Sequence, residues 1–294
     1  MLKRISLVML SVLLVTSCRF SEECNYTGSV EITSDWESLW GNLQKPDSLI
    51  ALFYRDGDIP IKKRLFGSST DTLYTGIPSG NTDMVVYNQP DGVQSKGLEV
   101  LSGAELRLPT HFEGNILAIG ECPMICSANH FFIVPIDDQI EQPISPLPIV
   151  KQLSFVVNVI REGITGELST CSASLSGIPT RYSLHRREAM RTKATVFFSL
   201  SKDAGDSDSF SHSFFVLGVN PDQHDQEIIP KKLSITITLD DGEVKDADFD
   251  LTELLNEFKS NIFKCEVSVK ITALSTEVTV VKWEQGTWEQ VTIQ

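Results

Sequence analysis

The feature that most constrains the fold is a recurring pattern of short alternating runs separated by turn residues. Residues 233–239 (LSITITL) alternate apolar and polar side chains, as a strand with one buried face does. Asp241-Gly242 then supplies a turn. β-rich runs recur at residues 28–33, 48–54, 72–75, 83–88, 116–120, 131–134, 152–160, 167–175, 195–200, 214–217, 265–272 and 277–283. Closely spaced strands of this kind predict an all-β fold of antiparallel sandwiches.

A proline-rich segment divides the chain. Residues 142–148 contain three prolines, which donate no backbone hydrogen bond and favour extended conformations. We therefore expect a linker at residues 142–149. It separates an N-terminal sandwich at 28–141 from a C-terminal sandwich at 150–294, and the length of 294 residues suits two domains.

One short helix is predicted, from residue 251 to residue 259. Asp250 stands at its N-cap and Glu253 follows three residues later, which is a variant of the capping box. The spacing of Asp246, Asp248 and Asp250 loosely resembles a calcium-binding EF-hand loop, but the glycine that such a loop needs at its sixth position is absent. We expect a solvated acidic loop here and no metal site.

The first 17 residues have the composition of a cleaved export signal. Lys3 and Arg4 precede an apolar run at residues 5–15. A helix that crosses the ~30 Å hydrocarbon core needs about 20 apolar residues, so this run is too short to span a membrane. The segment is therefore interpreted as a signal peptide.

The residues at the end of this signal form a lipobox, the cleavage motif of bacterial lipoproteins. Val15-Thr16-Ser17-Cys18 combines an aliphatic residue, two small residues and a cysteine. The motif predicts cleavage between Ser17 and Cys18 and attachment of lipid, palmitate included, to Cys18. Residues 18–27 would then be a lipidated tether, and several acyl chains would give stable anchoring. The alternative is an ordinary secretory signal in which Cys18 is incidental.

The composition is that of a globular protein, with 41% hydrophobic and 22% charged residues. The net charge is −14, and removal of the signal takes away two cations and no acids. Such a chain repels polyanions, so nucleic-acid binding is not expected.

Five cysteines are left once Cys18 carries lipid. In an exported protein they can form disulfides, although the sequence does not fix the pairing. The two in the motif CPMIC can close a small loop, and the two in the C-terminal half can pair with each other. Cys24 would then be free, and buried free thiols are the alternative for the other four: Cys122, Cys126, Cys171 and Cys265.

A single basic cluster interrupts the acidic chain. It can be a docking patch for an acidic partner or a protease-sensitive loop, or it can be an ordinary exposed surface. Its members are His185, Arg186, Arg187, Arg191 and Lys193.

The sequence contains none of the local motifs that mark common classes of enzyme. It has no Gly-x-Ser-x-Gly elbow, no His-Glu-x-x-His and no phosphate-binding glycine loop, and the CPMIC cysteines lack the second ligand pair of a zinc site. We expect neither enzymatic activity nor a cofactor. Four tryptophans can line a sugar platform, or they can plug the ends of the sandwiches: Trp36, Trp40, Trp283 and Trp288.

Taken in order, several short motifs resemble the fimbrillin-like accessory lipoproteins of Bacteroidetes, which include the FimB and Mfa-type fimbrial anchors. The resemblance covers nearly all of the chain after the signal. The motifs that carry it are Asp35-Trp36, Leu52-Phe53-Tyr54, Asp56-Gly57, the loop 73–80, Val85-Val86-Tyr87-Asn88, Leu175-Ser176-Gly177-Ile178, Phe215-Val216-Leu217-Gly218, the strand 233–239 with Asp240-Asp241-Gly242, and Asp250-Leu251-Thr252.

The resemblance implies two transthyretin-like β-sandwiches and a role in surface fimbriae. Anchors of that family stay lipidated in the outer membrane and pair with fimbrillin-like pilus subunits by strand exchange. Shaft subunits become competent when a protease removes their first strand after a basic residue. Here Arg55 is expected at a strand end and Lys62-Lys63-Arg64 in a loop, and no clear site lies earlier. This favours an anchor or accessory subunit.

The segment after the lipobox also resembles a known signal. Arg19-Phe20-Ser21-Glu22-Glu23 is similar to the short acidic signals that carry Bacteroidetes lipoproteins to the outer leaflet of the outer membrane. Surface exposure is the expectation, and a location that faces the periplasm is the alternative.

The sequence thus predicts a lipid-anchored outer-membrane protein that supports fimbria assembly and cell adhesion. A surface glycan- or ligand-binding lipoprotein of a nutrient-uptake system is the second hypothesis, and it requires an exposed aromatic platform. A lipid-anchored hydrolase is a third, and it requires a convergent His, Asp and Ser cluster.

Overall fold

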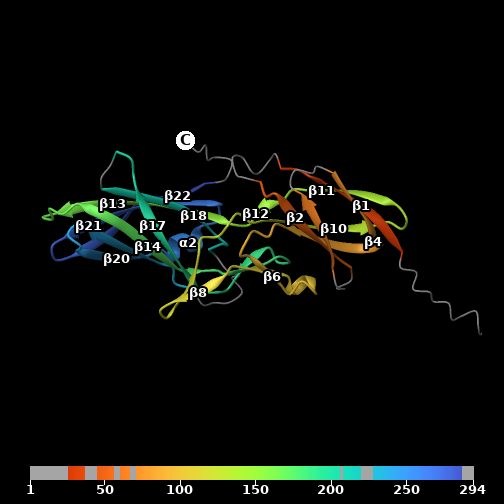
Figure 1. Cartoon of the computed structure of the whole chain (residues 1–294), viewed down its shortest axis with the longest axis horizontal. Coiled ribbons are helices and arrows are strands. Elements are labelled where there is room, and N and C mark those ends of the chain that lie inside the picture. Colours follow the sequence, from red (N-terminus) through yellow and green to blue (C-terminus); the bar gives the residue numbers. More distant parts are fainter. Residues whose placement is uncertain are drawn as a thin grey trace, which may run out of the picture.

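The computed structural model describes residues 26–36, 45–55, 60–66, 71–205, 208–219 and 228–286. The molecule is elongated, with its two halves arranged end to end (Figure 1). The described residues form an all-β structure of packed sheets with one short α-helix, so the predicted fold class is confirmed. Among these residues, no helix is long and apolar enough to cross a membrane.

The N-terminal sandwich packs a three-stranded sheet against a five-stranded sheet. The strand orders are β11-β1-β4 and β12-β10-β5-β2-β3. Side chains that alternate along β1 and β5 meet between the sheets in a core that includes Val30, Ile32 and Val86. The strands are β1 (Thr27–Ser34), β2 (Ser48–Tyr54), β3 (Ile61–Phe66), β4 (Asp71–Pro78), β5 (Gly80–Tyr87), β10 (Cys126–Val134), β11 (Gln139–Ile144) and β12 (Leu147–Pro148).

The C-terminal sandwich is built from longer strands. Its strands follow the order β20-β19-β14-β17-β18-β13-β21-β22, and β13 lies between β18 and β21. Phe155, Phe198, Phe214 and Phe263 form an aromatic group in its core. The strands are β13 (Lys151–Glu162), β14 (Leu168–Ile178), β17 (Ala194–Lys202), β18 (Ser209–Val216), β19 (Lys232–Leu239), β20 (Val244–Asp250), β21 (Ile262–Thr272) and β22 (Thr276–Gly286).

Strands from both halves meet at the waist of the molecule. A four-stranded sheet of order β16-β15-β7-β6 joins two strands from each half, and β9 of the β8–β9 hairpin pairs with β17. The segment predicted as a linker, 142–149, contains the end of β11 and all of β12. The waist elements are β6 (Gln94–Lys96), the 3-10 helix η2 (Leu101–Gly103), β7 (Glu105–Arg107), β8 (Thr110–Glu113), β9 (Ile116–Ile119), β15 (Arg181–Ser183) and β16 (Glu188–Met190).

Three details differ from the sequence expectations. The helix α2 is shorter than predicted and spans Thr252–Glu257, and its N-cap is Leu251, so the prediction of Asp250 at the N-cap was wrong by one position. The Asp250 carboxylate accepts the Thr252 backbone N–H at 2.8 Å from the position before the cap. Residues 62–64 lie in β3, so their prediction as a loop was wrong: they pair with residues 50–52 of β2. The sandwiches also contain parallel pairs, β1 with β11, β13 with β21 and β9 with β17, which the long connections between these strands permit.

Candidate functional site

The first strand is fully built into the N-terminal sandwich. β1 lies between β11, to which it is parallel, and β4, to which it is antiparallel. Its side chains Val30 and Ile32 are buried in the core. A Cβ on Gly28 would approach the Pro135 carbonyl oxygen to 2.2 Å, so this strand needs glycine where it passes the end of β10. The lipobox residues Ser17 and Cys18, Cys24 and nearly all of the predicted tether lie outside the described residues, and β1 begins nine positions after Cys18.

The last described strand, β22, is at one end of the strand order of the C-terminal sandwich. It pairs with β21 along one edge, and within the part of the chain that the structure describes no strand pairs with its other edge. Val278, Val280 and Trp283 pack toward the core, and Val281 is exposed at a register shift. A bulge and charged neighbours such as Lys282 are devices that keep an edge strand from random pairing. β20, at the other end of the strand order, comes close to part of β22 without pairing with it. The edge of β22 therefore has unpaired backbone groups that a partner strand could use, but access to them is restricted.

A cavity of about 560 Å³ lies on the outer face of the waist sheet. Successive pairings place Lys96, Glu105, Ser183 and Glu188 in one row across the four strands. A second row contains Arg107, Arg181 and Met190. Residues between the rows point the other way, into the core: Leu106, Tyr182 and Ala189. Strand alternation alone thus separates a charged face from an apolar one.

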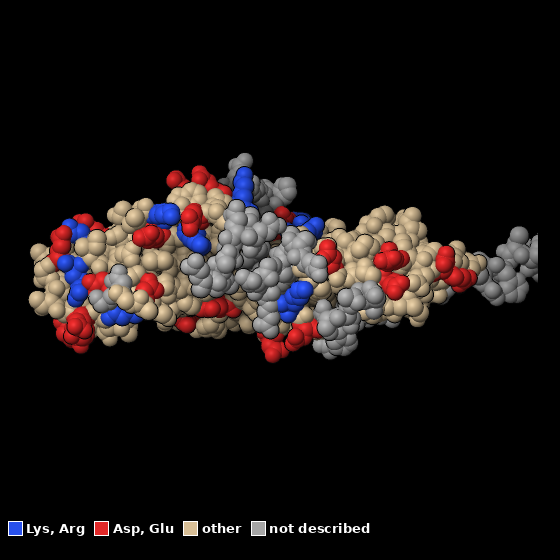
Figure 2. Space-filling view, turned by 90° about the horizontal axis from the view of Figure 1, so that it is seen from above, with Lys and Arg blue, Asp and Glu red and all other residues tan. Residues whose placement is uncertain are grey.

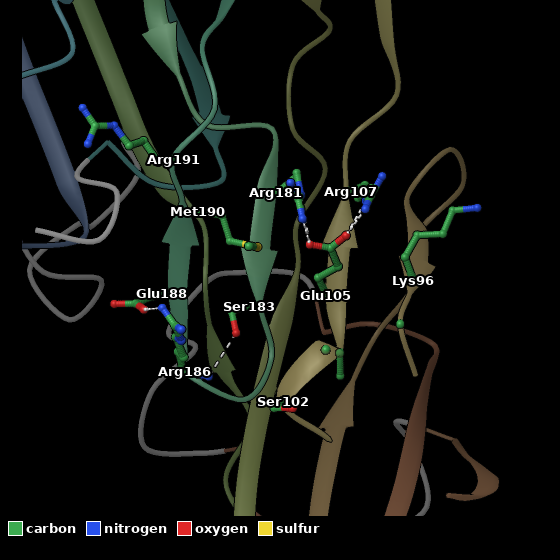
Figure 3. A pocket seen from close by; sticks show the side chains of 13 residues that line it. Lys96, Ser102, Glu105, Arg107, Arg181, Ser183, Arg186, Glu188, Met190 and Arg191 are labelled. Atoms are coloured by element: carbon green, nitrogen blue, oxygen red, sulfur yellow. Dashed lines mark hydrogen bonds and ion pairs between the residues drawn. The ribbon is translucent and has the colours of Figure 1, made fainter. Parts of the chain in front are cut away.

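Glu105 occupies the centre of this cavity. Its side chain is only 7% exposed, and one carboxylate oxygen accepts from Arg107 while the other accepts Nε and Nη2 of Arg181 at 2.9 and 2.5 Å. Figure 3 shows Glu105 between the two guanidinium groups. Because a buried carboxylate needs such partners, it fixes the orientation of both arginines. Each guanidinium keeps N–H donors beyond those that Glu105 accepts.

The predicted basic cluster is divided between two cavities. Arg186 and Arg191 line the cavity of the waist sheet, and Arg186 faces Glu188 at 3.7 Å. Arg187 has a positive φ of 60° and lines a neighbouring cavity. The pKa of His130 is lowered by burial and, to a smaller extent, by the charge of Arg187. His185 and Lys193 are exposed and line neither cavity.

Sequence reasoning missed Lys96, Glu105, Arg107 and Arg181. They lie on three short strands, β6, β7 and β15, that gave no signal because each has only three residues. Glu105 and Arg181 are 76 positions apart, so no spacing rule connects them. The only available signal was the proximity of Arg181 to the basic cluster.

The four cysteines predicted as possible disulfides are free and buried in the structure, so neither predicted pair is bonded. Burial raises the pKa of Cys126, Cys171 and Cys265 to about 12 and that of Cys122 further still. A thiol with so high a pKa is almost wholly protonated at neutral pH and is therefore a poor nucleophile. No group of His, Cys, Asp or Glu among the described residues is arranged to hold a metal ion.

The acidic residues of the EF-hand-like spacing lie in strand β20 and not in the solvated loop that the sequence predicted. Asp246 accepts the Thr236 hydroxyl at 2.7 Å, and Asp248 accepts the Ser234 hydroxyl at 2.6 Å. Asp248 also pairs with Lys232, and these hydrogen bonds lower its pKa. These are cross-strand contacts between β19 and β20.

The described tryptophans form no exposed platform. Trp36 is 6% exposed within the N-terminal core. Trp283 is half-buried and stacks on Phe263 with ring centroids 6.2 Å apart. Trp40 and Trp288 lie outside the described residues. Figure 2 shows acidic side chains spread over both halves and no continuous basic stripe on the face that it presents.

Comparison with solved structures identifies the fold. A candidate adhesin from Bacteroides ovatus is similar with a TM-score of 0.62 and 17% identity, over 78% of this chain and 84% of that one. The fimbrial anchor protein Mfa2 from Porphyromonas gingivalis is similar with a TM-score of 0.55 and 10% identity, over 88% of this chain and 96% of that one. The chain has the fold of the fimbrillin-like adhesins and fimbrial anchors.

The same fold occurs in a candidate polysaccharide-binding protein from Bacteroides thetaiotaomicron. Its TM-score is 0.52 at 9% identity, over 90% of this chain and all of that one. No family model and no curated protein matches the sequence. The similarity to these solved structures confirms, at the level of the fold, the resemblance that the short motifs indicated.

Proposed function

We propose that this protein is a lipid-anchored cell-surface subunit that anchors or caps a fimbria and supports adhesion. The observation that carries the proposal is β1, which begins nine positions after Cys18 and lies in the middle of its sheet. A lipid on Cys18 would then hold the molecule through a strand that is part of the core. A shaft subunit that loses its first strand needs the opposite arrangement.

The proposed contact to the fimbria is the free edge of β22. A partner strand beside it would satisfy outward-pointing N–H and C=O groups and would cover Val281, which is 58% exposed. The structural similarity to Mfa2, a fimbrial anchor, supports this role. The predicted location is the outer membrane, with the lipid as the membrane contact and fimbrillin-like subunits as partners. We propose a binding role and no enzymatic one.

Co-purification from the outer membrane tests this function. The native protein, a Cys18→Ala variant and a Cys24→Ala control are isolated, and bound proteins are identified by mass spectrometry. We expect the native protein and the control to bring down a series of fimbrillin-like subunits, and the Cys18→Ala form to lose them from the cell surface. An outer-membrane transporter as the main partner, or no partner, would contradict the anchor proposal.

A second candidate function is glycan binding at the cell surface. The Bacteroides thetaiotaomicron neighbour supports it, and so does the cavity of the waist sheet. The aromatic platform first expected for this function is not formed by the two described tryptophans. Recognition would instead depend on the polar and charged residues of the cavity.

A further inference from the structure

The cavity of the waist sheet is cationic within an acidic protein. Two acids and five cations line it, while the whole chain carries a net charge of −14. The acids are each engaged: Glu105 by two arginines and Glu188 by Arg186. The cations are Lys96, Arg107, Arg181, Arg186 and Arg191. The excess of positive charge inside a hollow attracts an anionic ligand.

The arginines at its centre are held in place before any ligand arrives. Glu105 fixes Arg107 and Arg181, whose side chains are 44% and 34% exposed, so both guanidiniums still reach the cavity. A preorganised pair of planar donors suits a carboxylate, which can accept two parallel N–H bonds. Because Glu105 already fixes these two side chains, they lose little further conformational entropy when a ligand binds.

One wall of the cavity is a tightly folded loop. Gly97 has a φ of +61°, and a Cβ there would lie 2.2 Å from the Gly103 carbonyl oxygen, so the loop requires glycine. The Tyr54 hydroxyl donates to the Leu98 carbonyl at 3.0 Å and ties this wall to β2. The opposite wall is the β15–β16 hairpin with Arg191 (Figure 3). A hollow with two fixed walls suits a compact ligand better than an extended peptide.

The remaining lining residues are suited to a hydroxylated ligand. Ser102 and Ser183 supply hydroxyl groups, and Met190 supplies a small apolar surface. The volume of about 560 Å³ is within the range of small-molecule sites, ~300–1,000 Å³. We propose that this cavity binds a carboxylated sugar, such as the terminal uronic or nonulosonic acid of an oligosaccharide. The arginines bind the carboxylate, and the serines and loop backbone bind ring hydroxyls.

This inference gives the glycan-binding candidate a ligand class and does not depend on fimbrial assembly. The test uses the full chain in detergent and immobilised oligosaccharides that end in glucuronate or N-acetylneuraminate, beside neutral ones that end in glucose or galactose. We expect binding to the acidic sugars only, and weaker binding as salt rises. Arg107→Gln and, separately, Arg186→Gln should each raise the Kd roughly tenfold. Arg181 still neutralises Glu105 in the first variant, and thermal melting confirms that each variant is folded.

The matched control is Lys282→Gln, which removes an exposed cation on β22 that is not among the lining residues and should leave the Kd unchanged. Equal binding of neutral and acidic sugars, or equal effects of Arg107→Gln and Lys282→Gln, would overturn the proposal. Binding of a polyglutamate peptide without binding of acidic sugars would also overturn it, in favour of a protein partner. Loss of the fimbrial subunits in the co-purification, with sugar binding intact, would count against the anchor alone.

Discussion

The two sandwiches differ in how their cores are closed. The N-terminal core is small and is confined between its own two sheets. The C-terminal core is much larger and continues through the waist to side chains of the first half, including Tyr54, Val85 and Tyr87. The comparison indicates that the C-terminal sandwich and the waist are one structural unit. The N-terminal sandwich projects from this unit and carries the strand nearest the predicted lipid.

This difference suits a molecule with two distinct tasks. In the proposed anchor, the end that carries the lipid needs a strand that resists being pulled out, and β1 is paired on both edges. The proposed contact to a partner subunit needs a strand edge with unpaired backbone groups, and β22 supplies one on the larger core. Substitutions in each core can separate these roles.

The largest effect is expected for Phe155→Ala. Phe155 is 1% exposed and contacts the rings of Phe198, Phe214 and Phe263. Truncation of a buried aromatic residue costs about 3–5 kcal/mol. Because this core reaches the waist, amide exchange should accelerate in β13 and also around Tyr87. Acceleration confined to the C-terminal strands would contradict a shared core.

Ile32→Ala should destabilise the N-terminal sandwich more selectively. Ile32 is 1% exposed on β1, and its truncation costs about 2–5 kcal/mol by the same cavity mechanism. Regional amide exchange should accelerate in β1, β4 and β11 and stay unchanged in β21. Thr33→Ala, at a neighbouring half-buried position of β1, is the matched control.

Tyr54→Phe should have a smaller effect that is centred on the cavity. It removes the hydrogen bond to the Leu98 carbonyl and keeps the ring in place. Loss of one such bond costs about 1 kcal/mol of unfolding free energy, measurable by urea denaturation. Acidic-sugar binding should weaken if the loop becomes mobile. An unchanged stability would show that Leu98 finds another donor.

The smallest effect concerns pH and the buried residue Lys231. Burial lowers its pKa from the usual 10.5, against an opposing effect of Asp250. The unfolded chain therefore binds more protons between the lowered pKa and 10.5, so stability from this group rises with pH in that window. Lys231→Met should flatten this rise in melting temperature, and Lys45→Met, at an exposed lysine of the N-terminal half, serves as the control. A rise that persists in Lys231→Met would contradict the assignment.

The sequence predicted the long strands well because their alternation is a local signal. The run 233–239 corresponds to β19, Lys232–Leu239. The waist was not predicted, since β6, β7 and β15 have three residues each, and the pairing of β7 with β15 joins segments far apart in the chain. The same long-range pairing brings Glu105 to Arg181, which local spacing does not reveal. Residues 62–64 were wrongly predicted as a loop because three consecutive basic residues resemble an exposed loop, whereas an edge strand such as β3 can also carry them.

The most direct test of the central claim is amide hydrogen exchange on the protein alone and bound to a co-purified fimbrial subunit. The account predicts new protection at alternate amides of β22, where a partner strand would pair, and unchanged protection in β1. Loss of protection in β1 on binding would mean that the first strand is displaced. That result, or the absence of any change in β22, would contradict an anchor that keeps its first strand and pairs through its last.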